Sequence, residues 1–132
     1  MTQIVHDRPE QLAMVQAGLL QGERAIAVFD CTGAGTGFIG LTNWRVLLQD
    51  KSFVGSQMAV TSVPYRSIQS VSMLSNKSMF GKFFSSSTIA VHTGSKVIVA
   101  EFRGDEKARY AHDVILWHLL HAASSPPAVP PS

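Results

Sequence analysis

The fold class is decided by one segment, Phe38-Ile39-Gly40-Leu41-Thr42-Asn43-Trp44-Arg45-Val46-Leu47-Leu48-Gln49. Two apolar runs, Phe38–Leu41 and Trp44–Gln49, flank the pair Thr42-Asn43. Asparagine tolerates the positive φ that a tight hairpin turn requires. We therefore predict two antiparallel strands joined by a two-residue turn.

Further strands are expected on both sides of this hairpin. They are Arg24–Cys31, Met58–Val63, Ile68–Leu74, Thr88–His92 and Lys96–Arg103. Thr93-Gly94-Ser95 predicts a second tight turn, whereas Thr32–Gly37 and the Ser-, Lys- and Phe-rich stretch Ser75–Ser87 are expected to be loops. Many short strands separated by turns favour a sandwich or a small barrel. The prediction is a mainly β, seven-stranded antiparallel fold.

A helix is expected before the first strand, from Pro9 to Gln21. Asp7 is placed to accept hydrogen bonds from the first free amides, Pro9 suits the first turn, and Glu10 fits a capping box. Gly22 is expected to end the helix. One apolar stripe follows the helical spacing, formed by Leu12, Val15 and Leu19. This stripe must be buried, either on the chain's own sheet or on a neighbouring subunit, so its three residues are candidate oligomer contacts.

A second helix is expected from Asp105, a suitable N-cap, to Ala122. Its broad apolar face has two adjacent stripes, formed by Tyr110, Val114 and Trp117 and by Ala111, Ile115 and Leu119. An amphipathic helix of this kind can close the open end of a curved sheet. The prediction places Trp117 in the core.

Length and composition indicate one globular domain. The chain has 132 residues, 45% hydrophobic and 15% charged, with a net charge of +2, so it lacks the strongly basic character of a nucleic-acid-binding protein. Its single cysteine, Cys31, cannot form an internal disulfide. Neither a signal peptide nor a membrane-spanning run is recognised, so the expected location is the cytoplasm. The predicted organisation is an N-terminal helix (1–22), a β domain (23–123) and a disordered proline-rich tail (124–132).

Several short segments, in this order and spacing, resemble the bacterial pleckstrin-homology (PH-like) domains, especially the short YokE-like kind. They are Leu20-Gln21-Gly22-Glu23, Leu41-Thr42-Asn43-Trp44-Arg45-Val46, Val63-Pro64-Tyr65-Arg66-Ser67-Ile68, Gly81-Lys82, Gly94-Ser95 and the final helix. The resemblance runs from about Leu19 to Leu120. It implies a PH-like superfold, a split barrel of two packed antiparallel sheets capped by the C-terminal helix. It also implies a binding or oligomerising module without enzymatic activity.

Phosphate binding is not expected at the glycine-rich loop. Eukaryotic PH domains bind phosphoinositides through basic residues in the first hairpin loop, but here that loop, Thr32–Gly37, has no Lys or Arg. A phosphate-cradling glycine loop is followed by a helix N-terminus, and a strand follows this one. We interpret the glycines as hairpin residues.

No motif predicts catalysis, a metal ion or a cofactor. His118 and His121 could share a helix face, yet further zinc ligands are missing and a position near a helix C-terminus explains both. The serines lack a nucleophile elbow, and the carboxylates are scattered. No small-molecule substrate is indicated either.

The stretch Ser75–Ser87 offers the best contact residues. Lysines alternate there with apolar side chains, which suits either an anionic membrane surface or a protein partner. The candidates are Lys77, Met79, Phe80 and Lys82, while Phe83 or Phe84 is expected to point into the core. The leading hypothesis is a self-associating or protein-binding module, and the alternative is a peripheral membrane module that uses residues 75–87.

Overall fold

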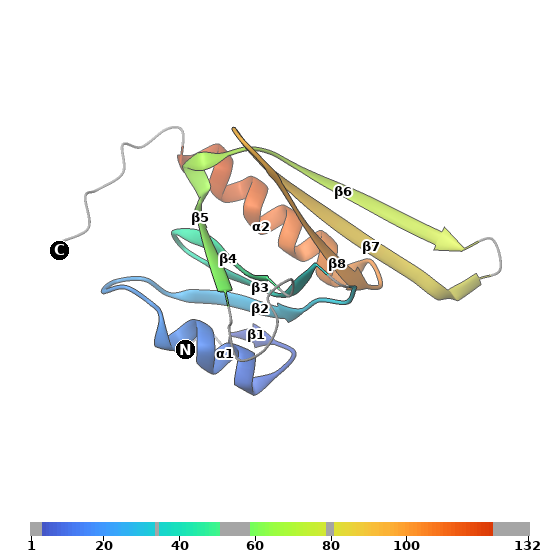
Figure 1. The fold of residues 1–132 in the computed structure, drawn as a ribbon, viewed down its shortest axis with the longest axis horizontal. Coiled ribbons are helices and arrows are strands. Elements are labelled where there is room, and N and C mark those ends of the chain that lie inside the picture. The colour runs from blue at the N-terminus through green and yellow to red at the C-terminus, as the bar shows by residue number, and fades with distance from the viewer. Residues whose placement is uncertain (1–3, 34, 51–58, 79–80, 123–132) are drawn as a thin grey trace.

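The computed structural model describes residues 4–33, 35–50, 59–78 and 81–122, and it shows two sheets and two α-helices (Figure 1). The first sheet has the strand order β1-β2-β3-β4-β5. Its strands are β1 Val5–His6, β2 Ala25–Asp30, β3 Thr36–Thr42, β4 Arg45–Asp50 and β5 Ala59–Pro64. β2 to β5 are antiparallel, and β3 and β4 form the predicted hairpin. The two-residue strand β1 was not predicted, and it pairs with β2 in parallel.

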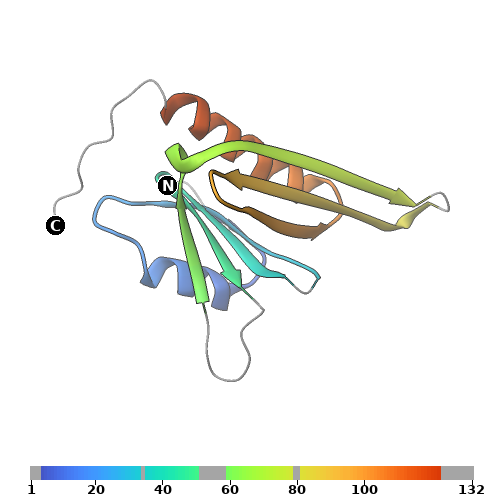
Figure 2. The same ribbon diagram turned by 45° about the horizontal axis from the view of Figure 1, so that its top comes forward.

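The second sheet has the order β6-β7-β8, with β6 Ile68–Ser78, β7 Gly81–Thr93 and β8 Val97–Arg103. A short 3-10 helix, η1 Tyr65–Ser67, connects it to β5. The predicted loop over Ser75–Ser87 is wrong, because the pairing of β6 with β7 continues through Ser75↔Ser87 and Asn76↔Ser86. Figures 1 and 2 show this hairpin projecting beyond the body of the domain, and the polar stretch Ser75–Ser78 has no apolar alternation from which a strand could be predicted.

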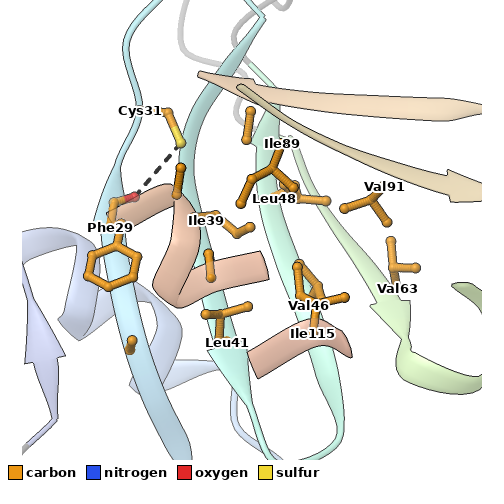
Figure 3. Close-up of a cluster of buried hydrophobic side chains, with 14 of the residues drawn as sticks. Phe29, Cys31, Ile39, Leu41, Val46, Leu48, Val63, Ile89, Val91 and Ile115 are labelled. Atoms are coloured by element: carbon orange, nitrogen blue, oxygen red, sulfur yellow. Dashed lines mark hydrogen bonds between the residues drawn. The ribbon is translucent and has the colours of Figure 1, made fainter. Parts of the chain in front are cut away.

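One core fills the space between the two sheets and α2, Glu106–Ala122. Its central side chains come from both sheets and from α2 (Figure 3). The helix buries Ala108, Ala111 and Ile115, which repeat at helical spacing. The prediction that Trp117 lies in the core is therefore wrong: the helix is rotated so that the small alanines approach the sheet, and Trp117 is 55% exposed.

The helix α1, Pro9–Ala17, covers the outer face of the first sheet (Figure 1). Val15 is buried in a small cluster with Val28, Phe38 and Leu47, and Leu12 and Leu19 are partly buried against it. The predicted apolar stripe is thus covered by the chain's own sheet. As a result β3 is buried along its whole length on both faces.

Both ends of α1 differ from the prediction. Arg8 occupies the N-cap position without a side-chain cap. The carboxylate of Asp7 instead accepts from the Asp30 amide (2.9 Å) and pairs with Lys107 (2.7 Å), which ties the N-terminal segment to β2 and α2. The helix ends at Gly18 rather than Gly22, because the chain must turn before it enters β2.

Gly40 lies close beneath α1, where a side chain has no room. A Cβ at this position would lie 2.9 Å from Val15 Cγ2 and 3.4 Å from Leu47 Cβ. Because a valine side chain has little freedom to move, we expect Gly40→Ala to lower the free energy of unfolding by about 1–3 kcal/mol, measured by urea denaturation. In a chain that already carries Val15→Ala, Gly40→Ala is expected to lower the free energy of unfolding much less, because the contacting methyl group is gone.

Gly35→Ala is the matched control, since a Cβ placed at Gly35 would have no atom within 4 Å and the stability of the variant is expected to change little. A Gly40→Ala protein as stable as the parent would show that α1 does not rest on the sheet in this way.

Candidate interaction surfaces

Three of the segments that suggested the family meet at one end of the first sheet. Glu23, from the segment before β2, places its fully buried carboxylate against the guanidinium of Arg45, at the start of β4. The contact is bidentate: Arg45 Nε donates to Glu23 Oε2 (2.8 Å) and a terminal nitrogen donates to Oε1 (2.9 Å). Such pairs are among the strong, directional interactions in proteins.

Both partners are satisfied by further hydrogen bonds. The Leu20 amide donates to Glu23 Oε1 (2.9 Å) and the Thr42 hydroxyl to Oε2 (2.7 Å). Burial by itself would raise the pKa of Glu23. The hydrogen bonds from Arg45, the Leu20 amide and Thr42, together with the charge of Arg45, outweigh burial and hold the pKa below its ordinary value of 4.5.

Arg45 also connects three elements. It donates to Gly18 O at the end of α1 (2.8 Å) and to Ser62 Oγ on β5 (2.9 Å). Arg45 is therefore not a solvated strand residue, and its side chain is only 18% exposed. Tyr65 completes the cluster, because its hydroxyl donates to Thr42 O (2.6 Å). A network so fully satisfied holds the fold together and leaves no group directed at a ligand.

An aromatic stack extends from Tyr65 along the exposed end of α2. The ring of His118 stacks on Tyr65 at 4.4 Å, and Trp117 stacks on His121 at 3.9 Å. Each histidine has its Nδ1 within hydrogen-bond distance of a carbonyl oxygen four residues earlier. These contacts give both histidines a structural role. In the described part of the chain no three His, Cys, Asp or Glu residues are placed to hold a metal ion.

The outer face of the second sheet is the most unusual surface. Three cross-strand rows of outward positions are Ser70, His92 and Val97; Ser72, Ala90 and Val99; and Leu74, Thr88 and Glu101. The next row on the same face places Arg103 beside Ser86. The alternate positions of the same strands, such as Ile89 and Phe102, face the core. A sheet with one face in water normally carries polar and charged residues on that face. Here two rows have no Lys, Arg, Asp or Glu, and Val97 and Val99 are 53% and 48% exposed.

A cavity of about 340 Å³ lies where the N-terminal segment meets the end of β8 and the start of α2. It is lined by Asp7, Arg8, Asp30, Thr32, Arg103 and Lys107. Asp7 is paired with Lys107, and Asp30 accepts from Gln11 Nε2 (2.8 Å) and lies near Arg8 (3.5 Å). These ion pairs fasten the N-terminal segment to the body.

The predicted contact residues have different outcomes. Leu12, Val15 and Leu19 lie together on α1, where the chain's own sheet covers them. Met79 and Phe80 lie outside the described residues, as does the proline-rich tail. Lys77 belongs to β6 and Lys82 to β7, but their side chains are not among the described parts of the structure. The outer face of the second sheet was not singled out from the sequence, because Val97 and Val99 alternate with residues that are just as apolar.

The glycine loop forms a hairpin connection, as expected. Gly33 has a φ of +84°, and β3 begins at Thr36, so a strand follows the glycines. The loop is fixed to the second sheet: the Thr32 amide donates to Glu101 O (2.8 Å) and the Thr36 hydroxyl to Val99 O (2.6 Å). The loop therefore joins the two sheets along the edge of β8.

Two packed sheets with a C-terminal helix across them define a PH-like fold. The family described as "Bacterial PH domain" matches residues 18–116, and the chain belongs to this family. Domains of this class are typically binding modules rather than catalysts. The prediction of the family and of the fold is confirmed.

Two solved structures show the same fold. A pleckstrin homology domain from Shewanella amazonensis SB2B has 19% sequence identity and a TM-score of 0.63, covering 86% of this chain and 99% of that one. A DUF1696 family protein with a pleckstrin-homology domain from Shewanella loihica PV-4 has 16% identity and a TM-score of 0.63, covering 86% of this chain and 94% of that one. Among curated proteins no sequence matches. No helix in the described part is long and apolar enough to cross a membrane.

Proposed function

We propose that this chain is a non-catalytic cytoplasmic module that assembles with copies of itself. The observation that carries the proposal is the gathering of exposed apolar side chains on two surfaces, the outer face of the second sheet and the C-terminal half of α2. Leu74, Val97 and Val99 lie on the first; Leu116, Trp117 and Leu120 lie on the second. Exposed apolar side chains gathered on one surface are typical of protein contacts.

The test is the mass of the purified full chain in solution, measured by light scattering on a sizing column over about a hundredfold range of concentration. A defined oligomer, or a mass that rises smoothly with concentration, is the expected result. A monomer across the whole range would contradict self-assembly.

The N-terminal stripe remains a separate proposal for the contact. Because Leu12, Val15 and Leu19 pack on their own sheet, they could contact another subunit only if α1 were exchanged between two copies. In that case deleting residues 1–21 is expected to abolish the defined oligomer, leaving monomer together with the non-specific aggregate that uncovered Val28, Phe38 and Leu47 favour. An oligomer that keeps its subunit number after the deletion would rule out the exchange.

Binding to an anionic membrane is the second candidate function, and the projecting hairpin favours it. β6 and β7 extend away from the body of the domain (Figure 2), and Lys77 and Lys82 belong to these strands. Basic residues on a projecting hairpin would be attracted to anionic headgroups. We expect sedimentation with phosphatidylserine-containing vesicles that weakens with salt and with Lys77→Gln/Lys82→Gln. Equal sedimentation with neutral phosphatidylcholine vesicles would contradict this role.

A further inference from the structure

The outer face of the second sheet has the chemistry of a protein contact rather than of a lipid or nucleic-acid site. None of the three rows between Ser70 and Glu101 contains a Lys or Arg, and the first basic residue on this face is Arg103, in the row beyond them beside Ser86. Its one carboxylate, Glu101, turns to the side, where its Oε2 would lie 2.8 Å from a Cβ placed on Gly33. The centre of the face therefore offers only Ser, Ala, Thr, His, Val and Leu side chains. A partner that buries this centre must itself be almost uncharged.

The shape of the face is uneven in a particular way. On the β8 side, Val97 and Val99 stand out from the sheet, whereas Ser70 and Ser72 on the β6 side are small. Between them Ala90 occupies the middle strand, β7, directly beside both Ser72 and Val99. Across these two rows the face therefore has a ridge on β8 and a trough on β6; in the third row Leu74, which is 61% exposed, ends the trough on the β6 side.

Ridge and trough are complementary under a two-fold axis that runs along β7. This rotation brings β8 of one copy over β6 of the other, so Val99 faces Ser72 of the second copy and Val97 faces Ser70. A two-fold contact uses the same patch on both subunits, and this patch is complementary to itself. Packed sheets lie about 10 Å apart, a distance that interdigitated small and β-branched side chains fill.

The other side of β8 is already closed. The Thr36 hydroxyl and the Thr32 amide donate to the carbonyls of Val99 and Glu101, so a partner strand cannot extend the sheet there. A contact that covers the exposed valines must therefore approach the face and not the β8 edge.

We propose that a second copy of this chain covers the outer face of β6, β7 and β8, with Val97 and Val99 of each copy packed on Ser70, Ser72 and Ala90 of the other. This inference rests on the proposed self-assembly and names its surface. Three strands by five residues make a face of about 14 by 17 Å. The area of this face, about 240 Å², is well below the roughly 800 Å² that each partner buries in a stable interface. The dimer is thus expected to be weak and concentration-dependent.

The decisive substitution is Val99→Lys. In a two-fold dimer it buries a lysine at each of the two ridge-to-trough contacts, and we expect the dissociation constant to rise at least about tenfold. Val60→Lys is the matched control, because Val60 is also an exposed strand valine, on β5 and away from the face. Circular dichroism and thermal melting confirm that each variant is folded.

A mixing experiment tests the pairing itself. Ser72→Glu alone is expected to weaken the dimer as Val99→Lys does, because it places a carboxylate under the ridge. Mixing the two variants brings the introduced lysine of one copy against the introduced glutamate of the other and is expected to restore association, seen as a mass above that of either variant alone. Raising the salt concentration is expected to weaken this mixed dimer more than the parent dimer.

The outcomes separate the inference from the proposed function. A parent chain that stays monomeric contradicts self-assembly and the inference together. A parent oligomer that Val99→Lys leaves unchanged contradicts the inference alone, and so does one that Val60→Lys dissociates equally, since added charge would then explain the effect. Failure of the two weakened variants to associate when mixed overturns the ridge-to-trough arrangement.

Discussion

Replacing Glu23 by alanine is expected to lower the free energy of unfolding by about 3–5 kcal/mol, because it leaves the guanidinium of Arg45 without its buried carboxylate. The Thr42 hydroxyl and the Leu20 amide lose their acceptor as well. Urea denaturation measures the loss. Replacing both partners, Glu23→Leu with Arg45→Met, is expected to cost far less than Glu23→Ala, since no charge is then left unpaired.

The exposed pair between Asp7 and Lys107 is the control. Lys107 retains almost half of its side-chain exposure, so Lys107→Met is expected to cost at most about 1 kcal/mol. A Glu23→Ala protein with only this small loss would show that the buried pair does not hold the three elements together.

The same carboxylate predicts how stability depends on pH. The folded-state pKa of Glu23 lies below its ordinary value of 4.5. The contribution of the ionised Glu23 carboxylate to folding stability is therefore fully present above pH 4.5 and is lost as the pH falls through the folded-state pKa. The parent is therefore expected to lose stability on acidification more steeply than the Glu23→Leu/Arg45→Met variant. Parallel slopes in the two proteins below pH 4.5 would contradict the assignment.

Phe102→Ala is expected to have an effect of similar size, about 3–5 kcal/mol. Phe102 is fully buried on β8 and meets the ring of Phe29 edge to face, at 6.4 Å and 84°. Its removal leaves a cavity between the two sheets that the surrounding strands cannot close. Val97→Ala, on the same strand but facing outward, is the control and is expected to change the free energy of unfolding by less than about 1 kcal/mol. Equal losses at the two positions would mean that the faces of β8 are assigned wrongly.

Local patterns in the sequence were sufficient to predict where most of the strands lie. The turn at Thr42-Asn43 and the strand over Lys96–Arg103 are encoded within a few residues, and both appear as predicted. The sequence of this strand did not identify the buried face of β8, because Val97 and Val99 are as apolar as Ile98 and Ala100. Only packing against Phe29 and α2 shows which set is inside.

Features that depend on distant residues could not be predicted. Arg45 alternates outward from Val46 on its strand, and nothing near it in the sequence indicates that Glu23 will meet it. The face of α2 that is buried depends on the space left by the two sheets, which accepts Ala111 and Ile115 but leaves Trp117 outside. The long hairpin was missed because its serine-rich sequence resembles that of a loop.

The double coverage of β3 has a consequence for where the independently folding unit begins. The family match starts at residue 18, yet α1 lies before it and covers Val28, Phe38 and Leu47. A shortened chain that starts at the match would turn these side chains out to water on the surface of the sheet, which favours aggregation. The minimal unit suited to expression and hydrogen-exchange work therefore includes β1 and α1, starting at Val5. Within that unit, the amides of β3 are expected to be among the slowest to exchange.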